Sequence, residues 1–265
     1  MEPTFLKRPS PLYYRESGEG RPLVLLHGLG SDHRIWDRTG RQLGASHRLF
    51  APDLPGHGHS PRLSRYGLDQ YVAAIADWLD ALDLGPVPVV GHSWGGTIAL
   101  ALALSRPELV SWVGAVCPVW LFGTTMPRRV QYRFMAFGAA QAFRKPSGGA
   151  TRRFLRHGMG VTAERITPSL VRLWQESSVP STGTVFRTFR QLRRSRAALV
   201  SELDGVHCPV WFAWGRQEPL CPTRSQVEQL LDELPEAKVA FMETGHLPMF
   251  EAAEEFGARL EAELP

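Results

Sequence analysis

The 265-residue sequence is poor in cysteine and has no long apolar run. Its three cysteines, Cys117, Cys208 and Cys221, are an odd, widely spaced set without the close pairing of metal ligands. Such a set argues against a disulfide scaffold and favours a reduced, cytoplasmic protein. The longest apolar stretch, residues 98–104, is far too short to cross a bilayer, and residues 1–20 lack the apolar core of a signal peptide. We therefore expect no membrane span and no export.

Signatures of nucleotide binding are missing as well. The segment "HGLGSDH" (residues 27–33) lacks the third glycine of G-x-G-x-x-G, and no G-x-x-x-x-G-K-[ST] occurs. The sequence also has no internal repeat and no low-complexity tract. With 43% hydrophobic and 10% aromatic residues, the chain is expected to fold around a substantial core. We expect neither a cofactor nor a metal.

The positive charge is confined to one segment. Residues 119–206 contain fourteen Arg and one Lys against three Glu and one Asp, which gives this segment a net charge of +11. The rest of the chain carries −7, and the formal net charge is +4. Because the excess charge belongs to one part of the chain, the overall basic balance does not indicate a nucleic-acid partner.

Short apolar runs alternate with helical patterns along most of the chain. This alternation is typical of βαβ units and predicts an α/β fold, a mostly parallel sheet flanked by helices. Residues 68–82 show the i, i+3, i+4, i+7 apolar spacing of an amphipathic helix. The other predicted elements are strands at 22–28, from 48, and at 87–90, 110–116, 208–215 and 237–243, and helices at 95–105, at about 223–234 and from 250.

Residues 119–206 interrupt the alternation. They are rich in Arg and aromatic residues, look helical, and show no clear strand. Residues 146–149, Pro168 and Pro180 are the predicted helix breakers. We therefore predict an α/β core made of residues 1–118 and 207–265, with a helical insertion at 119–206.

The stretch "GHSWGG" (residues 91–96) connects a predicted strand to a predicted helix and matches G-x-S-x-G. A strand that stops at Gly91 and a helix that begins after Ser93 force a strained turn at the serine. Gly91 and Gly95 relieve the crowding two residues to either side. The turn exposes the hydroxyl, and the helix N-terminus favours negative charge that develops beside it. The pattern predicts a nucleophilic Ser93; an ordinary glycine-rich turn is the alternative.

A serine nucleophile needs a base, and the base needs a carboxylate to orient it. Three histidines follow Ser93. His157 lies in the insertion, and His207 directly precedes a strand, at the wrong end of the sheet. His246 follows the strand at 237–243, which places it at the carboxyl edge where ligands bind in open α/β sheets. We predict His246 as the base; a surface loop histidine is the alternative.

Glu218 is the candidate acid. It lies three residues beyond Gly215, where the predicted strand 208–215 ends at the same carboxyl edge. No other acidic residue competes well, because the strand that ends near Cys117 is followed by no carboxylate until Glu164. A surface glutamate in a salt bridge is the alternative.

Two backbone N–H groups are needed to stabilise an oxyanion. The predicted donors are the amide of Trp94, directly after Ser93, and the amide of Leu29, in the loop after the strand 22–28. His27 of that loop is expected to be structural. Five apolar residues could line a substrate pocket and could equally belong to the core: Trp36, Trp120, Phe122, Leu247 and Met249.

Five blocks, in this order, resemble the α/β-hydrolase superfamily over the whole chain: "HGLGSDHRIW", "DLPGHGHS", "GHSWGGTIALALAL", "WGRQEPLCP" and "GHLPMFEAAEEF". The resemblance implies Ser93 as nucleophile, His246 as base, Glu218 as acid and residues 119–206 as a cap (lid). The sequence departs from the family at Glu218, where most relatives with this block have Asp. Epoxide hydrolases and haloalkane dehalogenases are similar but have a carboxylate at the elbow, so Ser93 argues against both.

The resemblance implies a cofactor-independent serine hydrolase, a carboxylesterase that cleaves a carboxylic ester through an acyl-enzyme. Relatives that cleave thioesters, lactones, C–C bonds or amides (proline iminopeptidases) begin at the same elbow, and the sequence does not separate them. A non-catalytic ligand-binding protein of the same fold is the alternative from another class.

The arginines of the insertion have two interpretations. They solvate a helical cap, or they recruit an acidic acyl carrier protein or a CoA ester, because guanidinium groups bind carboxylate and phosphate. The pimeloyl-acyl-carrier-protein methyl esterases, which the chain resembles in size, use a basic cap toward an acidic carrier. Two clusters carry the charge: Arg187, Arg190 and Arg194 at helical spacing, and Arg152, Arg153 and Arg156.

Overall fold

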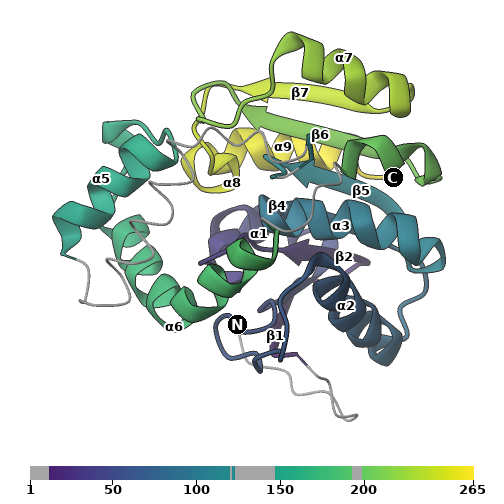
Figure 1. The fold of residues 1–265 in the computed structure, drawn as a ribbon, viewed down its shortest axis with the longest axis horizontal. Helices are drawn as coiled ribbons and strands as arrows, with labels where there is room; N and C mark the ends of the chain where they lie inside the picture. Colours follow the sequence, from purple (N-terminus) through teal and green to yellow (C-terminus); the bar gives the residue numbers. More distant parts are fainter. Residues whose placement is uncertain (1–11, 120, 123–146, 193–198) are drawn as a thin grey trace.

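The computed structural model of the protein describes residues 12–119, 121–122, 147–192 and 199–265 (Figure 1). Seven strands form one sheet in the order β1-β3-β2-β4-β5-β6-β7. All neighbouring strands are parallel except β1, which is antiparallel to β3. This confirms the predicted α/β fold. The strands are β1 (Tyr14–Ser17), β2 (Arg21–Leu26), β3 (His47–Pro52), β4 (Val87–His92), β5 (Val110–Val116), β6 (Val210–Gly215) and β7 (Lys238–Met242).

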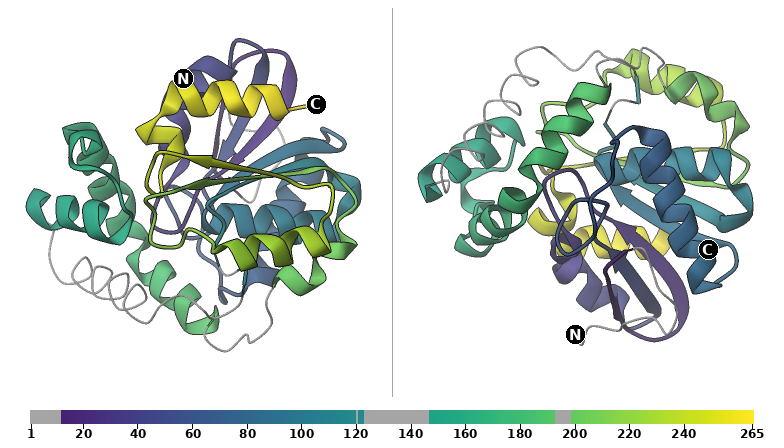
Figure 2. Two further views of the ribbon diagram at one scale, coloured as in Figure 1. Left: turned by 90° about the horizontal axis from the view of Figure 1, so that it is seen from above. Right: turned by 60° about the horizontal axis from the view of Figure 1, so that its bottom comes forward.

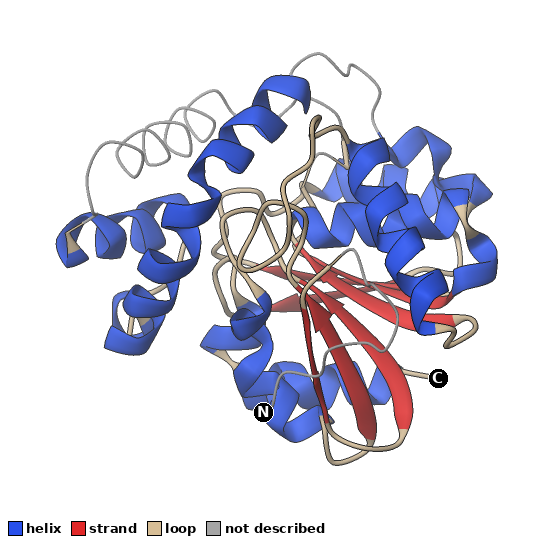
Figure 3. Ribbon diagram, turned by 90° about the horizontal axis from the view of Figure 1, so that it is seen from below, coloured by secondary structure: helices blue, strands red, loops and turns tan. Residues whose placement is uncertain are grey.

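Helices cover both faces of the sheet (Figure 3). On one face α1 packs against α9, and on the other α2 packs against α3, which lies on β4 and β5. The strongly apolar α3 is buried over most of its length, which fixes the turn that precedes it. The helices flanking the sheet are α1 (Asp37–Leu43), α2 (Leu68–Leu82), α3 (Trp94–Ser105), α7 (Arg224–Glu233), α8 (Pro248–Glu251) and α9 (Ala253–Glu263), with 3-10 turns η1 (His33–Trp36) and η2 (Pro107–Leu109).

The described part of residues 119–206 is helical and lies between β5 and β6 in the chain. It forms α5 (Gly148–Gly158), η3 (Ala163–Arg165), α6 (Pro168–Leu192) and η4 (Leu199–Gly205), and no strand occurs in its described residues. Helices α5 and α6 pack against each other at one side of the molecule (Figures 1 and 2). Loops from the sheet gather between the strands and these helices (Figure 3).

Helix α6 differs from the sequence-based expectation. It begins at Pro168, a position that suits proline, but it continues through Pro180, which the sequence analysis takes as a breaker. The helix is tied to the core on both sides of Pro180. The Ser177 hydroxyl lies 3.3 Å from the Gly30 carbonyl and also donates to the Leu173 carbonyl at 2.9 Å, and the Thr184 hydroxyl donates to the Gly56 carbonyl at 3.0 Å. These contacts offset the one backbone hydrogen bond that proline removes.

The core lies along the central strands and the helices that sandwich them. The side chains of β2, β4, β5 and β6 are almost entirely buried, as expected of parallel strands covered on both faces. No helix in the described ranges combines the length and the apolarity that crossing a membrane requires.

Candidate active site

Ser93 occupies a strained turn between β4 and α3. Its backbone has φ 55° and ψ −115°, outside the conformations that residues other than glycine favour. The turn is held by the Ser93 N–H, which donates to the Val116 carbonyl at 2.7 Å. A methyl group on Gly91 would overlap the Gly95 carbonyl, and one on Gly95 would lie 2.5 Å from the Leu26 carbonyl oxygen. The crowding that the sequence predicts is therefore present, and only glycine fits at both positions.

His246 and Glu218 form a buried pair. His246 lies in the loop between β7 and α8, and Glu218 lies in the loop after β6, so both are at the carboxyl edge of the sheet. The His246 Nδ1–H donates to Glu218 Oε2, and the two residues are only 3% and 5% exposed. Because a carboxylate only accepts, this contact places the ring proton on Nδ1 and leaves Nε2 as the basic nitrogen.

The backbone of His246 is held on both sides. Its N–H donates to the Met159 carbonyl at 2.8 Å, and its carbonyl accepts a hydrogen bond from His92 Nε2 at 2.7 Å. Met159 directly follows α5, so the insertion takes part in fixing the His246 loop. The contact is close: a Cβ on Gly245 would lie 2.5 Å from the carbonyl carbon of Gly160.

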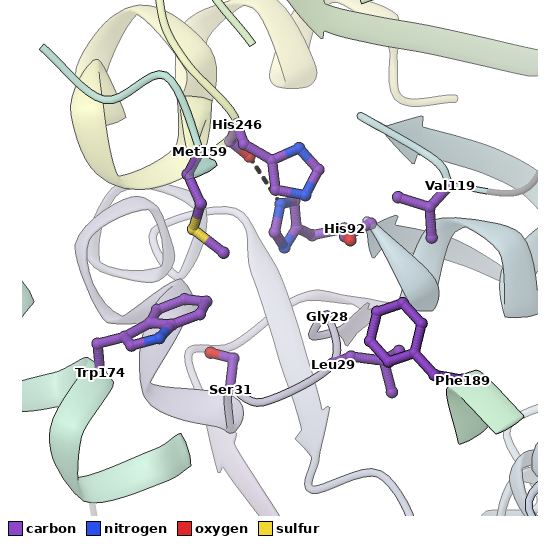
Figure 4. Close-up of a pocket in the computed structure, with 10 residues that line it drawn as sticks. Gly28, Leu29, Ser31, His92, Val119, Met159, Trp174, Phe189 and His246 are labelled. Atoms are coloured by element: carbon purple, nitrogen blue, oxygen red, sulfur yellow. Dashed lines mark hydrogen bonds between the residues drawn. The ribbon is translucent and has the colours of Figure 1, made fainter. Parts of the chain in front are cut away.

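Ser93 and His246 line the same cavity, which Figure 4 shows with His246 labelled. Its wall is mainly apolar, and it combines the loops after β2 and β4 with side chains from the insertion. Leu29, the predicted second oxyanion donor, belongs to this wall. The lining residues are Gly28, Leu29, Ser31, His92, Ser93, Val119, Met159, Trp174, Phe189 and His246.

None of the described residues predicted to form the pocket is among those that line this cavity. Leu247 and Met249 are fully buried in the core and do not line this cavity. Trp36 packs against Phe256 with ring centroids 6.3 Å apart and borders a different, smaller cavity. Phe122 is partly buried against the core, and Trp120 lies outside the described residues.

The apolar walls come instead from the insertion and the segment leading into it: Val119, Met159, Trp174 and Phe189. Sequence reasoning missed these residues because no local motif marks them, and only the docking of α5 and α6 brings them to Ser93. His92 and Ser31, however, stand inside the quoted "GHSWGG" and "HGLGSDH" blocks, so their position in those blocks was a usable signal.

Comparison with known proteins decides the family. The sequence profile of the alpha/beta hydrolase fold matches residues 21–253. The chain belongs to the alpha/beta hydrolase fold family. The hydrolase is 27% identical to the pimeloyl-[acyl-carrier protein] methyl ester esterase of Aliivibrio fischeri, over 95% of this chain and 96% of that protein.

Two further relatives differ in their named activity. The (E)-2-((N-methylformamido)methylene)succinate hydrolase of Acinetobacter baylyi is 27% identical, over 78% of this chain and 76% of that protein. The solved structure of a thermophilic esterase from Thermogutta terrifontis superposes with a TM-score of 0.78 at 18% identity, over 95% of this chain and 92% of that chain. At that identity the structure supports the fold alone.

Buried histidines surround the site of the hydrolase. Burial lowers the pKa of His92 well below its ordinary value, and the neighbouring His246 ring lowers it further, so His92 is neutral. His27, predicted to be structural, has its pKa lowered by burial. Its Nε2 accepts the Leu54 N–H at 2.8 Å and its Nδ1–H donates to the Gly28 carbonyl at 2.8 Å. This pairing confirms the structural role.

Two buried clusters of the hydrolase contain residue types that bind metals. Within each cluster the ligand atoms of the three residues lie within 4.8 Å of one another. In both, the histidine Nδ1 is already hydrogen-bonded to a carboxylate. Burial and the nearby Glu218 charge raise the pKa of the Cys117 thiol well above its usual value, which disfavours the thiolate that a metal requires. The clusters are Cys117, Glu218 and His246, and Asp32, His33 and Asp53.

Proposed function

We propose that the protein is a cofactor-independent carboxylesterase with Ser93 as nucleophile, His246 as base and Glu218 as acid. One observation carries the proposal: His246, whose Nδ1–H is paired with the buried Glu218, lines the same cavity as Ser93 in its strained turn. In this proposal α5 and α6 act as the cap over the site.

The reaction proceeds through an acyl-enzyme. His246 Nε2 removes the Ser93 hydroxyl proton while Ser93 Oγ attacks the ester carbonyl carbon. The amides of Leu29 and Trp94 donate to the oxyanion that forms. His246 then gives the proton to the leaving alcohol as the C–O bond breaks. In the second half, His246 deprotonates a water molecule, which attacks the acyl carbon and releases the acid and Ser93.

The chemistry of the cavity wall favours esters with an apolar acyl group. Thioesters, lactones, amides and C–C bonds remain the alternative substrates, because relatives with those activities share the elbow.

Kinetics of single variants test the proposal. Hydrolysis of p-nitrophenyl butyrate by Ser93→Ala and by His246→Ala is expected to fall roughly a thousandfold or more, because nucleophile and base act as a unit. Ser105→Ala, at the far end of α3, is the matched control and keeps wild-type turnover. Near-normal turnover by Ser93→Ala would contradict the mechanism. A chain-length series of esters and matching thioesters ranks the substrate classes.

A carrier-bound or CoA ester is a second candidate substrate. The arginines of α5 (Arg152, Arg153 and Arg156) and of α6 (Arg187 and Arg190) are exposed; Arg194 lies outside the described residues. One relative is named as acting on an acyl-carrier-protein ester. A surface of one charge sign speeds the encounter with an oppositely charged partner, and salt screens that effect.

Salt dependence distinguishes this candidate from simple solvation of the helices. With an acyl-carrier-protein ester, kcat/KM is expected to fall steeply as salt rises, whereas a small neutral ester is indifferent. Reversing the charge in the single variants Arg187→Glu and Arg190→Glu weakens only the former, and Arg41→Glu on α1 is the charge-matched control. Equal salt dependence for both substrates would mean that the arginines only keep the helices solvated and bind no carrier.

A further inference from the structure

The cavity beside Ser93 contains a buried hydroxyl group without a partner. Ser31 lies in the loop after β2 and is 1% exposed. Its N–H closes a turn with the Gly28 carbonyl at 3.2 Å, but its Oγ makes no hydrogen bond to any group in the described part of the chain. In Figure 4 the hydroxyl oxygen points toward the side of the cavity where the Trp174 ring lies.

An unpaired buried hydroxyl is unusual, because its desolvation is not compensated. Around Ser31 the cavity wall is largely apolar, with Leu29, Met159 and Phe189 among its members. A purely structural serine would be expected to bond to a nearby carbonyl, as Thr184 and Ser177 do elsewhere. Ser31 is therefore placed for a partner that arrives with the substrate.

A second atom on the same wall restricts what that partner can be. His92 Nε2–H donates to the His246 carbonyl, so Nδ1 is unprotonated and can only accept. Nδ1 is buried and has no hydrogen-bond partner among the described residues. A Cβ at Gly28 would lie 3.0 Å from Nδ1 and 2.9 Å from Ser93 Cβ, so the glycine keeps this corner free of a side chain.

We propose that Ser31 is a specificity-determining residue that binds a hydroxyl group of the substrate, with His92 Nδ1 as a further acceptor. Ser31 Oγ donates and accepts, whereas Nδ1 only accepts, and a hydroxyl group can form a hydrogen bond with either atom. The preferred substrates are then small esters with a hydroxyl near the scissile bond. This inference rests on the proposed ester hydrolysis at Ser93.

A set of matched esters tests the proposed role of Ser31. The values of kcat/KM are compared for methyl butyrate, methyl 2-hydroxybutyrate, methyl 3-hydroxybutyrate and 2-hydroxyethyl butyrate, which place a hydroxyl on either side of the ester. Wild type is expected to favour at least one hydroxylated ester over methyl butyrate by about tenfold or more. In Ser31→Ala that ratio falls to near one, and in the control Ser105→Ala it stays at the wild-type value. The Tm of Ser31→Ala is not lowered, because an unpaired buried hydroxyl adds no stability.

The outcomes separate this inference from the proposed function. If wild type hydrolyses methyl butyrate but favours no hydroxylated ester, or if the preference survives in Ser31→Ala, the role of Ser31 is overturned while the esterase proposal stands. If Ser31→Ala has a lower Tm but the same ratio of kcat/KM values as wild type, the Ser31 hydroxyl stabilises the fold, and its role in specificity is overturned as well. If wild type hydrolyses none of the four esters and Ser93 resists acylation, the proposed function fails and this inference fails with it.

Discussion

Glu218 reaches His246 from the loop after β6 and lies beside the buried Cys117 at the end of β5. A glutamate side chain is one methylene longer than aspartate, and the loop accommodates it with the pair almost fully buried. The neutral Cys117 thiol borders the carboxylate and adds no negative charge of its own. The arrangement leaves Glu218 as an acceptor for the His246 Nδ1–H.

Glu218→Gln tests this role at the residue scale. The amide removes the negative charge that stabilises the protonated histidine, so kcat is expected to fall by two to four orders of magnitude, roughly the range for this kind of change. Circular dichroism and Tm check that the fold is kept. Full activity in Glu218→Gln would assign the acid to another residue.

The residues of the proposed triad are recognisable from the sequence because each follows a strand within a local motif. The strand pattern, together with the rule that the carboxyl ends of parallel strands share one edge of the sheet, is enough to predict Ser93, Glu218 and His246. Trp36, Leu247 and Met249 do not line the cavity at Ser93, because an apolar side chain near a motif packs into the core as readily as it lines a cavity. Their apolar character alone does not tell whether their side chains face the core or the cavity.

At the scale of elements, the turn between β4 and α3 depends on close contact between the backbones of neighbouring segments. Gly91 and Gly95 bring the end of β4, the start of α3 and the Leu26 carbonyl within contact distances that exclude a Cβ. The tight packing fixes where the Ser93 hydroxyl lies. Gly183, exposed within α6, has no such restriction: beyond its own helix turn, no atom in the described part of the chain lies within 4 Å of the point where a Cβ would be.

These two kinds of glycine are expected to respond in opposite ways to alanine. Gly95→Ala clashes with backbone that cannot move cheaply and is expected to lower the free energy of unfolding by about 1–3 kcal/mol, with loss of activity. Gly183→Ala is the matched control, since alanine in an exposed helix stabilises by about 0.5–1 kcal/mol. Urea unfolding measures both; a Gly95→Ala protein as stable as wild type would contradict the packing argument.

Elements with strong periodicity were predictable, and short or polar ones were not. The amphipathic α2 and the buried α3 follow directly from their sequences. Strand β1, with the sequence YRES, and helix α1, with an internal glycine, carry no comparable pattern and form because tertiary neighbours hold them. The continuation of α6 through Pro180 likewise depends on contacts with the core that no local signal reveals.

At the scale of the whole molecule, three buried neutral histidines make stability sensitive to acid. Burial lowers the pKa of His27, lowers that of His92 well below its ordinary value, and together with the His27 ring lowers that of His57 to about 3. In the unfolded chain each has a pKa near 6.5. Below that pH the unfolded state binds more protons than the folded state, so stability is fully present above pH 6.5 and is lost as pH falls toward 3.

Denaturant unfolding between pH 8 and pH 5 measures this loss. The free energy of unfolding is expected to be level above pH 7 and to fall below pH 6.5, with a limiting slope of roughly 1.4 kcal/mol per pH unit for each histidine that stays neutral in the fold. His57→Gln removes one of the three titrating groups and makes the slope correspondingly shallower. An unchanged slope in His57→Gln would show that this histidine is not held neutral in the fold.

The most direct test of the central proposal is covalent labelling of the wild-type protein with a fluorophosphonate, followed by peptide mass spectrometry. Ser93 combines a strained turn with a cavity it shares with His246, so we expect one adduct, on the peptide containing Ser93, and none in Ser93→Ala. His246→Ala is expected to label far more slowly. An adduct on another residue, or no adduct under conditions that label a known serine esterase, would contradict the assignment of Ser93 as the nucleophile.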